Sequence, residues 1–384
     1  MSIEGEIHVA VRWNGGEIER AELRSSRPFV APRLLAGKTV AEACALVPLL
    51  FSICGRSQAI AAAAACDAAV GRETQPAVAG ARTLLVAGEA MQEYLFRALI
   101  DWPLLRGEPP VAHVVAEARR RIASALLPLE PVVGAQPRSP DAAACAAAAE
   151  ALRHAARVAA EEVFGEHPEN WLAGVEASGV EPWAGGRKTV AARLVADALD
   201  ADPRFGASDV PLLPTADHDH LARQLAAAMD ADAMFERSPQ WRGRPAETGA
   251  LARVSGSGVV GSLITRFGRS VLARLVARLV ELAGLASGAP RANAGQLTLS
   301  PGDGIGWVET ARGLLVHRAR IAEGRVAGYR IVAPTEWNFH ADGAVARGLR
   351  GARFADPGAV ERGVRLLVQS LDPCVAARVE VVHA

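Results

Sequence analysis

The stretch ETARGLLVHRARIAEGRVAGYRIVAPTEWN, residues 309–338, does most to decide the fold. It contains two strand-like pieces, 313–317 and 325–333, so this part of the chain is expected to carry β structure. A helix is expected further on, near 357–371, and Asp372-Pro373-Cys374 follows it directly. The C-terminal part therefore combines strands with a helix.

The rest of the chain predicts mostly helices. Residues 5–12 and 17–24 alternate apolar and polar side chains around Asn14-Gly15-Gly16, which predicts a β-hairpin. Apolar side chains recur at helical spacing in 39–51 (with a break at Pro48), 57–71, 78–100 (ending before Trp102-Pro103), 111–127, 141–163 and 263–285. Loops are expected at 128–140 and 286–306, and 165–260 gives only short periodic pieces. The sequence therefore predicts a mainly α (α+β) body with small β elements at both ends.

The composition excludes several classes of protein. Of 384 residues, 50% are hydrophobic and 22% are charged, which is enough apolar material for a large core. Lys+Arg and Asp+Glu both number 42, so the basic excess typical of nucleic-acid binding is missing. The alanine run Ala59–Ala65 is too short and too weakly apolar to span a bilayer, so no membrane insertion is expected.

Cysteine usage and the N-terminus favour a cytoplasmic protein. Met1–Arg12 is polar and acidic and lacks the apolar core of a signal peptide. The cysteines are odd in number and widely spread, so no disulfide framework is expected; they occupy positions 44, 54, 66, 145 and 374. Cys44, Cys66 and Cys145 lie on alanine-rich helical faces and are expected to pack in the core.

Few residues indicate chemistry by their pattern alone. Cys54 and Cys374 are single thiols far apart in sequence, which is no metal motif, and inert packing is the commoner role of such cysteines. Asp217-His218-Asp219-His220 looks like a ligand cluster, but four consecutive polar residues cannot all face one ion, so a solvated loop is expected. His317 and His340 are candidates of the same weak kind.

Several segments taken together resemble the large subunit of nickel–iron hydrogenases, in order and over nearly the whole chain. That family reads R-x-C-G-x-C, then E-A-P-R-G-x-L-x-H and V-x-P-T-x-W-N, and closes with D-P-C-x-x-C-x-x-H. The matching text here is Arg27-Pro28-Phe29-Val30, Gly37-Lys38, Ser52–Ser57 (SICGRS), Glu309–His317 (ETARGLLVH), Ala333–Asn338 (APTEWN) and Asp372–Ala377 (DPCVAA). The resemblance implies the large-subunit fold, a helical bundle with peripheral β-hairpins. It also implies that Cys54 and Cys374 meet at the core, with Cα atoms within about 7 Å.

The departures from the family bear on function. In the enzymes each cysteine motif supplies one thiolate that is terminal on nickel and one that bridges nickel to iron. This chain keeps both terminal positions, Cys54 and Cys374, but has Ser57 and Ala377 at the bridging positions. A hydroxyl replaces a bridging thiolate poorly and a methyl not at all, so the dinuclear centre and hydrogen turnover are not expected. Further departures are Val30 for the proton-relaying glutamate, Ser52 for the motif arginine, Glu380 (with His383 nearby) for the closing histidine, and an end at Ala384 without the extension of enzyme precursors.

The retained residues suit a different task. In the family, the arginine matched by Arg312 overhangs the metal site, and the threonine matched by Thr335 donates a hydrogen bond to a cyanide on iron. The resemblance therefore implies a pocket for one iron with its cyanide and carbonyl ligands, Fe(CN)2CO, without nickel, held by Cys54, Cys374, Arg312 and Thr335. The alternative stays open that Arg312 pairs with Glu309 or Asp372 and that Thr335 caps a turn.

As a whole the chain resembles HupK-type accessory proteins, inactive relatives of the large subunit that serve hydrogenase maturation. The resemblance implies one domain over 1–384, made of a hairpin (1–25), the first cysteine segment with the helical bundle (26–164), a variable middle region (165–305) and the Arg/Thr block with the last cysteine segment (306–384). It implies a scaffold that transiently holds the iron fragment for the immature large subunit. The implied partners also include small chaperones of the HypC/HupF type and the iron-cofactor assembly proteins. Two alternatives are a metal-free chaperone that mimics the large subunit and shields intermediates from oxygen, and an electron-transfer or quinone-site relative like the related complex I subunit.

Overall fold

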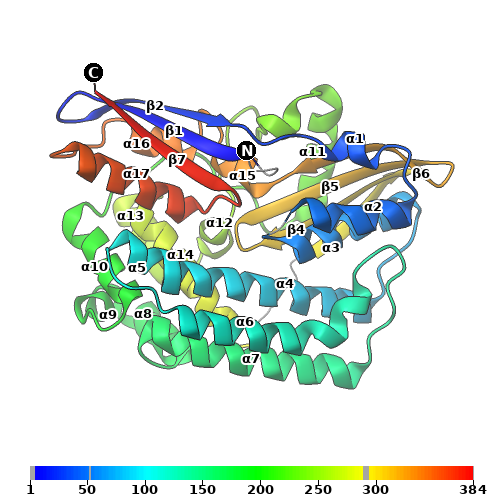
Figure 1. The fold of residues 1–384 in the computed structure, drawn as a ribbon, viewed down its shortest axis with the longest axis horizontal. Helices are drawn as coiled ribbons and strands as arrows, with labels where there is room; N and C mark the ends of the chain where they lie inside the picture. Colours follow the sequence, from blue (N-terminus) through cyan, green and yellow to red (C-terminus); the bar gives the residue numbers. More distant parts are fainter. Residues whose placement is uncertain (1–4, 52, 289–293, 384) are drawn as a thin grey trace.

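The structure, a computed structural model, describes residues 5–51, 53–288 and 294–383 (Figure 1). The main helices are α1 (Ala31–Leu35), α2 (Val40–Leu46), α3 (Gly55–Ala69), α4 (Pro76–Phe96), α5 (Trp102–Leu105), α6 (Ala112–Leu126), α7 (Ala142–Phe164), α8 (Pro168–Ser178), α9 (Glu181–Gly185), α10 (Val190–Ala201), α11 (His218–Ala231), α12 (Ala250–Val254), α13 (Gly258–Phe267), α14 (Val271–Ala286), α15 (Pro334–Asn338), α16 (Ala344–Leu349) and α17 (Pro357–Leu371). The strands are β1 (Glu6–Trp13), β2 (Ile18–Ser25), β3 (Ala294–Ser300), β4 (Asp303–Thr310), β5 (Gly313–Ala322), β6 (Arg325–Val332) and β7 (Ala376–His383). The mainly α (α+β) class is confirmed.

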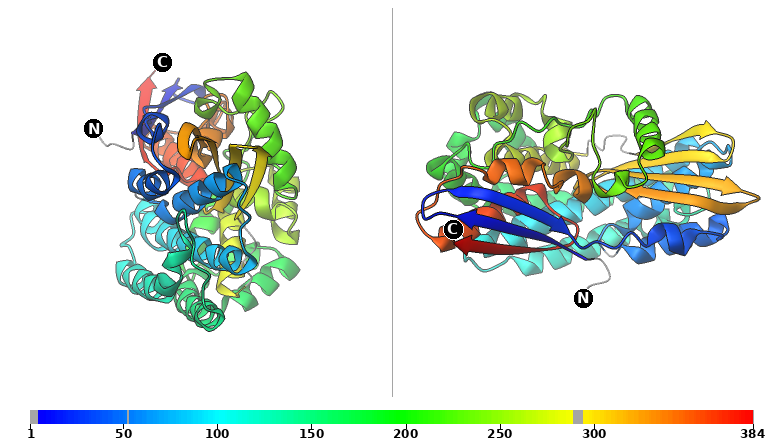
Figure 2. Two further views of the ribbon diagram at one scale, coloured as in Figure 1. Left: turned by 90° about the vertical axis from the view of Figure 1, so that its right-hand side faces the viewer. Right: turned by 90° about the horizontal axis from the view of Figure 1, so that it is seen from above.

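The first sheet joins the two ends of the chain. The predicted N-terminal hairpin is confirmed, since β1 and β2 pair antiparallel. Strand β7, which the sequence did not predict, pairs parallel to β1 on its other side, with Ala377 opposite Ile7 (Figure 2). This pairing fixes the position of the segment just before β7, which contains Cys374.

The second sheet, in the order β3-β4-β5-β6, packs against the alanine-rich helix α3. Its closest approach is at two glycines of β4: a Cβ on Gly304 would lie 2.2 Å from the Ala69 nitrogen, and one on Gly306 would lie 2.5 Å from the Ala65 nitrogen. Only residues with minimal side chains allow a helix backbone to lie this close to a strand. The alanine run is therefore a packing surface, and Cys54 stands at its N-terminal end.

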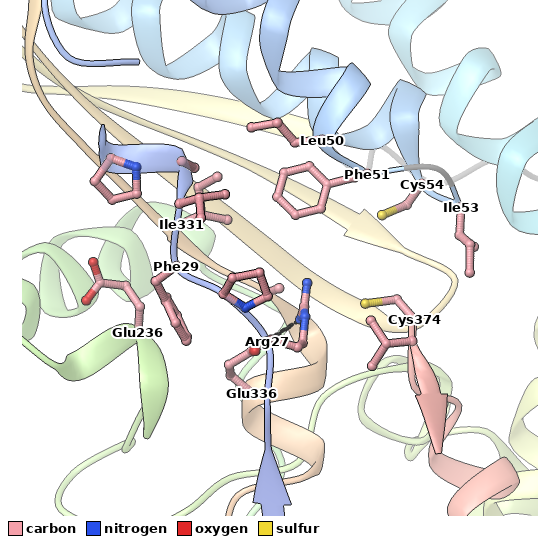
Figure 3. Close-up of a pocket in the computed structure, with 16 residues that line it drawn as sticks. Arg27, Phe29, Leu50, Phe51, Ile53, Cys54, Glu236, Ile331, Glu336 and Cys374 are labelled. Atoms are coloured by element: carbon pink, nitrogen blue, oxygen red, sulfur yellow. Dashed lines mark hydrogen bonds and ion pairs between the residues drawn. The ribbon is translucent and has the colours of Figure 1, made fainter. Parts of the chain in front are cut away.

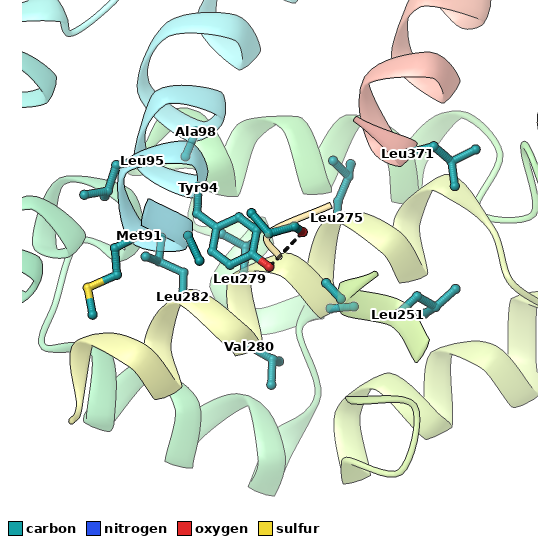
Figure 4. Close-up of a cluster of buried hydrophobic side chains, with 14 of the residues drawn as sticks. Met91, Tyr94, Leu95, Ala98, Leu251, Leu275, Leu279, Val280, Leu282 and Leu371 are labelled. Atoms are coloured by element: carbon teal, nitrogen blue, oxygen red, sulfur yellow. Dashed lines mark hydrogen bonds between the residues drawn. The ribbon is translucent and has the colours of Figure 1, made fainter. Parts of the chain in front are cut away.

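The helical bundle forms the base of the molecule, and its centre is the contact between α4 and α14. Met91, Tyr94 and Leu95 of α4 belong to the same cluster of buried side chains as Leu275, Leu279 and Leu282 of α14, and the Tyr94 ring points towards α14 (Figure 4). The same hydrophobic core extends to the first sheet and to α17. Burial of this apolar surface holds the cysteine-bearing segments on a rigid support.

Some sequence predictions about element boundaries were wrong. Residues 286–306 were expected to be a loop, yet β3 and the first half of β4 lie there; 289–293 are outside the described residues. The single helix expected at 263–285 is two helices, because Gly268 adopts φ +74° and Ser270 caps α14. The long helix did not end before Trp102 but runs through a π turn into α5.

Other predictions were confirmed. Helix α2 ends at Leu46 and a 3₁₀ segment containing Pro48 follows, and α6, α7 and α17 lie where they were expected. The expected loop at 128–140 begins with a 3₁₀ segment, Leu127–Val132, while the hard-to-read region 165–260 holds α8 to α12 and the start of α13. Among the described residues, no helix combines the length and apolar character needed to cross a membrane.

Candidate metal-binding pocket

Cys54 and Cys374 line one pocket, whose walls also include residues 27–32 around the start of α1, the segment before α3, and Glu336 of α15 (Figure 3). Cys54 immediately precedes α3 as its N-cap residue, and Cys374 lies between α17 and β7. Both sulfur atoms point into the same space, as Figure 3 shows. The two segments, 320 residues apart in sequence, thus meet as the family resemblance implied; the Cα separation of about 7 Å stays a prediction. Ser52 lies outside the described residues.

Asp372 positions Cys374 by ending α17 in an unusual backbone conformation. Its φ of 55° is in the left-handed region, and its buried carboxylate is surrounded by arginines. Oδ1 lies 2.7 Å from Nη2 of Arg97 and 3.4 Å from Nε of Arg312, and Oδ2 lies 4.0 Å from Nη2 of Arg278. Although burial favours the neutral acid, these guanidinium groups lower the pKa of Asp372. The loop before Cys374 is therefore fixed by buried charge.

Arg312 lies between the carboxylates and the two thiols. It donates from Nη2 to Glu93 Oε2 at 2.7 Å and contacts Asp372. Burial disfavours its charge, but Asp372 and Glu93 raise its pKa, so it remains a cation. The alternative pairing with Glu309 was wrong, because Glu309 accepts from Arg253 at 2.7 Å and contacts His218 at 3.0 Å. The pairing with Asp372 was confirmed.

Thr335 contacts the second thiol directly. Its Oγ1 lies 3.1 Å from Cys374 Sγ and accepts a hydrogen bond from the Cys374 backbone N–H at 3.3 Å. The N-cap residue of α15 is Ala333, without a side-chain cap, so Thr335 does not cap its own helix, and its hydroxyl instead accepts a backbone N–H from the bend that contains Cys374. Because the hydroxyl oxygen already accepts from the N–H, its own proton can be donated to the sulfur.

The groups around Cys54 shift the pKa of its thiol in opposite directions. Burial raises the pKa of the Cys54 thiol, and the neighbouring Cys374 and Glu89 raise it further. Arg312 and a hydrogen bond from Gln58 act in the opposite direction. A soft cation that binds the two sulfurs would displace their protons, since the thiolate is the metal ligand.

Neither residue at the bridging positions offers a ligand to this pocket. The Ser57 hydroxyl donates to Oε1 of the buried Glu89. The same carboxylate accepts the backbone N–H of Ser57 on Oε1 at 3.3 Å and that of Arg56 on Oε2 at 3.0 Å. Ala377 belongs to β7 and presents only a methyl group. Within 5–51, 53–288 and 294–383, no group of three or more His, Cys, Asp or Glu side chains could hold a metal ion. The protein's own soft ligands at the pocket are therefore two sulfurs.

A buried ion pair lines the pocket, and sequence reasoning gave it no role. Arg27 Nη1 donates to both oxygens of Glu336, at 2.8 and 3.0 Å. Burial raises the pKa of Glu336, while Arg27 opposes that rise. Both residues belong to segments that match the family motifs, and this match was the one feature of the sequence that could have pointed to a role at the pocket. Val30, at the place of the family's glutamate, also lines the pocket.

The remaining candidates lie elsewhere. His317 is buried and bonded to Gln58 and Tyr329, and His340 contacts Ser238. The expected solvated loop at 217–220 was wrong, because Asp217 caps α11 and the following residues form its first turn. Cys44 and Cys66 are buried in the core, as expected, and Cys145 packs partly buried against it. All five cysteines are free thiols.

Comparison with known proteins gives a consistent result. The family model described as nickel-dependent hydrogenase matches residues 262–380. The chain is 33% identical to the hydrogenase expression/formation protein HoxV of Cupriavidus necator, over 93% of this chain and 92% of that protein. It is also 33% identical to the hydrogenase expression/formation protein HupK of Azotobacter vinelandii, over 99% of both. The nickel–iron–selenium hydrogenase of Desulfovibrio vulgaris Hildenborough has the same fold, with a TM-score of 0.61 and 13% identity over 96% of this chain and 98% of that one.

Proposed function

Because the chain belongs to the HupK/HoxV family of hydrogenase expression/formation proteins, we propose that it is a catalytically inactive accessory protein of nickel–iron hydrogenase maturation. Its task is to hold the iron fragment Fe(CN)2CO transiently as cargo and to pass it to the immature large subunit. The partners are chaperones of the HypC/HupF type, the iron-cofactor assembly proteins and that subunit.

The observation that carries this proposal is the ligand set of the pocket. Two thiols, Cys54 and Cys374, converge on it, whereas the bridging positions hold a hydroxyl engaged by Glu89 and a methyl. Two sulfurs can serve one soft metal ion that brings further ligands of its own, but they cannot bridge a second metal as four would. The donor set therefore fits a single soft metal ion. The assignment to iron comes from the family resemblance, in which Cys54 and Cys374 match the nickel-terminal positions and would bind iron here instead.

The polar groups around the sulfurs fit the ligands of the cargo. Cyanide ligands are anionic hydrogen-bond acceptors, and the Arg312 cation and the Thr335 hydroxyl are both close to the thiols. Arg27 adds a second guanidinium at the pocket wall. Because two terminal ligands hold less tightly than a bridged centre, release to the large subunit stays feasible.

Infrared spectroscopy tests the proposal. The protein is purified without oxygen from a host that expresses the hydrogenase maturation proteins, together with Cys54→Ser and Cys374→Ser, and with Cys145→Ser as a matched control outside the pocket. We expect cyanide and carbonyl stretches with iron but no nickel in the wild type and in Cys145→Ser. Both pocket variants should lose them. Wild-type protein that lacks these bands would contradict the cargo role.

A metal-free chaperone is the second candidate, and a surface feature favours it. Apolar side chains stand exposed at or beside the residues that line the pocket: Leu34 is 47%, Leu49 79% and Ile53 38% exposed. A contact with another protein would cover these side chains, which this candidate takes to be the docking surface. This candidate predicts that Cys54→Ser and Cys374→Ser still bind the chaperones and support maturation.

A further inference from the structure

Cys54 is the end of a chain of buried hydrogen bonds. Gln58 Nε2 lies 3.7 Å from Cys54 Sγ, Gln58 Oε1 lies 2.9 Å from His317 Nε2, and His317 Nδ1 lies 2.8 Å from Tyr329 Oη. Gln58 lies in the first turn of α3, His317 on β5 and Tyr329 on β6, and none is more than 3% exposed. The chain thus crosses from the second sheet to the pocket.

The chemistry of the side chains determines which atom donates in each of these hydrogen bonds. Gln58 Oε1 can only accept, so His317 Nε2 must carry a proton. Burial lowers the pKa of His317 to about 3, so the ring is neutral and Nδ1 is left as an acceptor. Tyr329 therefore donates to Nδ1, and each donor in turn points towards Cys54. The Gln58 amide then faces the sulfur with an N–H group.

We propose that Gln58, His317 and Tyr329 are positioning residues. They hold the Gln58 N–H group against the Cys54 sulfur and so orient that sulfur towards the metal. The proposal rests on the proposed function only in taking Cys54 as a ligand. Thr335 serves the same purpose at Cys374, where its hydroxyl lies 3.1 Å from the sulfur. Each sulfur thus has one donor from the protein.

Such outer contacts matter because they fix the direction of a ligand's lone pairs and tune its electron donation. Loss of a group of this kind weakens metal binding by about tenfold or more. A purely structural role predicts something else: removing the Tyr329 hydroxyl would lower stability but leave the metal site unchanged. The two roles are separable by a direct probe of the sulfur.

Cadmium ion is a suitable probe, because its bond to a thiolate gives an ultraviolet charge-transfer band. The ion is titrated into reduced, metal-free protein for the wild type, Tyr329→Phe and Gln58→Leu. Tyr94→Phe is the matched control. Tyr94 is the protein's other tyrosine and is also buried, but its hydroxyl donates to Glu281 and takes no part in the hydrogen bonds that lead to Cys54. Cys54→Ser identifies the part of the signal that belongs to Cys54. Thermal unfolding of every variant checks that it folds.

We expect Tyr329→Phe and Gln58→Leu to weaken cadmium binding about tenfold. Their band should shift to lower energy, because the sulfur lone pair loses its N–H donor. Tyr94→Phe should match the wild type in both cadmium affinity and the energy of the band. If Cys54→Ser reduces binding while Tyr329→Phe and Gln58→Leu leave affinity and band unchanged, the positioning role is refuted and the proposed ligand survives. If Cys54→Ser binds like the wild type, both ideas fail together.

Discussion

Replacement of Asp372 by asparagine should reveal how much the buried charge cluster stabilises the protein. Asparagine has nearly the same shape and tolerates the left-handed backbone at φ 55°, so the substitution changes the charge and little else. Arg97 keeps a second partner in Asp101, and Arg312 keeps Glu93. Arg278 is left with backbone carbonyls, those of Gln369 at 3.3 Å and Ser370 at 3.1 Å.

The magnitude follows from this loss. Breaking a buried ion pair by removing one partner costs about 3–5 kcal/mol, and two of the arginines keep a carboxylate, so we expect about 3 kcal/mol for Asp372→Asn. Urea unfolding followed by tryptophan fluorescence measures it. Asp209→Asn is the control, since Asp209 also binds two arginines but has a side chain 68% exposed. It should cost less than about 1 kcal/mol.

The same variant has a defined pH dependence. The arginines lower the pKa of Asp372 in the folded protein, so its stabilisation is fully present above the unfolded value of about 3.9 and is lost as the pH falls through the folded value. The difference in free energy of unfolding between wild type and Asp372→Asn should therefore be constant from about pH 5 to 8 and shrink below about pH 4. A cost no larger than that of Asp209→Asn at pH 7 would refute the reasoning.

Three further substitutions test other parts of the structure. Gly306→Ala should destabilise by about 3 kcal/mol in urea unfolding, because its Cβ would lie 2.5 Å from the Ala65 nitrogen, whereas Gly174→Ala, with open space around it, should not. Thr335→Val keeps the shape but removes the hydroxyl, so it should weaken cadmium binding at Cys374 about tenfold with little change in melting temperature. Leu49→Glu should leave stability within about 0.5 kcal/mol, because the side chain is 79% exposed, but should reduce co-purification of partner proteins. Unchanged co-purification would argue against this surface as a contact.

The sequence predicted the helices well because their apolar faces repeat locally, as in α7 and α17. It failed at β4, whose eight residues are all buried. A strand buried on both faces shows no alternation, and Gly304 and Gly306 looked like loop residues although they allow α3 to lie against the strand. Strand β7 was missed because its partner β1 is at the other end of the chain.

The candidate site was predicted unevenly for a similar reason. Cys54, Cys374, Arg312 and Thr335 stood in motifs that the family resemblance could match. The structure places both cysteines on one pocket, Thr335 against Cys374, and Arg312 within electrostatic reach of both thiols. Apart from Asp372, which was one of two partners considered for Arg312, their partners could not be assigned. Glu93 is 219 residues from Arg312, and no local pattern in a single sequence indicates such a contact. The pairing of Arg27 with Glu336, 309 residues apart, is the same case.

The parallel pairing of β1 with β7 also sets the order in which the protein can become competent during its synthesis. Strand β1 leaves the ribosome early, but its parallel neighbour β7 is made only after some 360 intervening residues, and closing so long a loop is slow. Until β7 docks, the segment that carries Cys374 lacks this support, and before Cys374 is synthesised the pocket has only one of its thiols. If the pocket holds the iron fragment as we propose, both thiols can hold it only after this last part of the chain has been made.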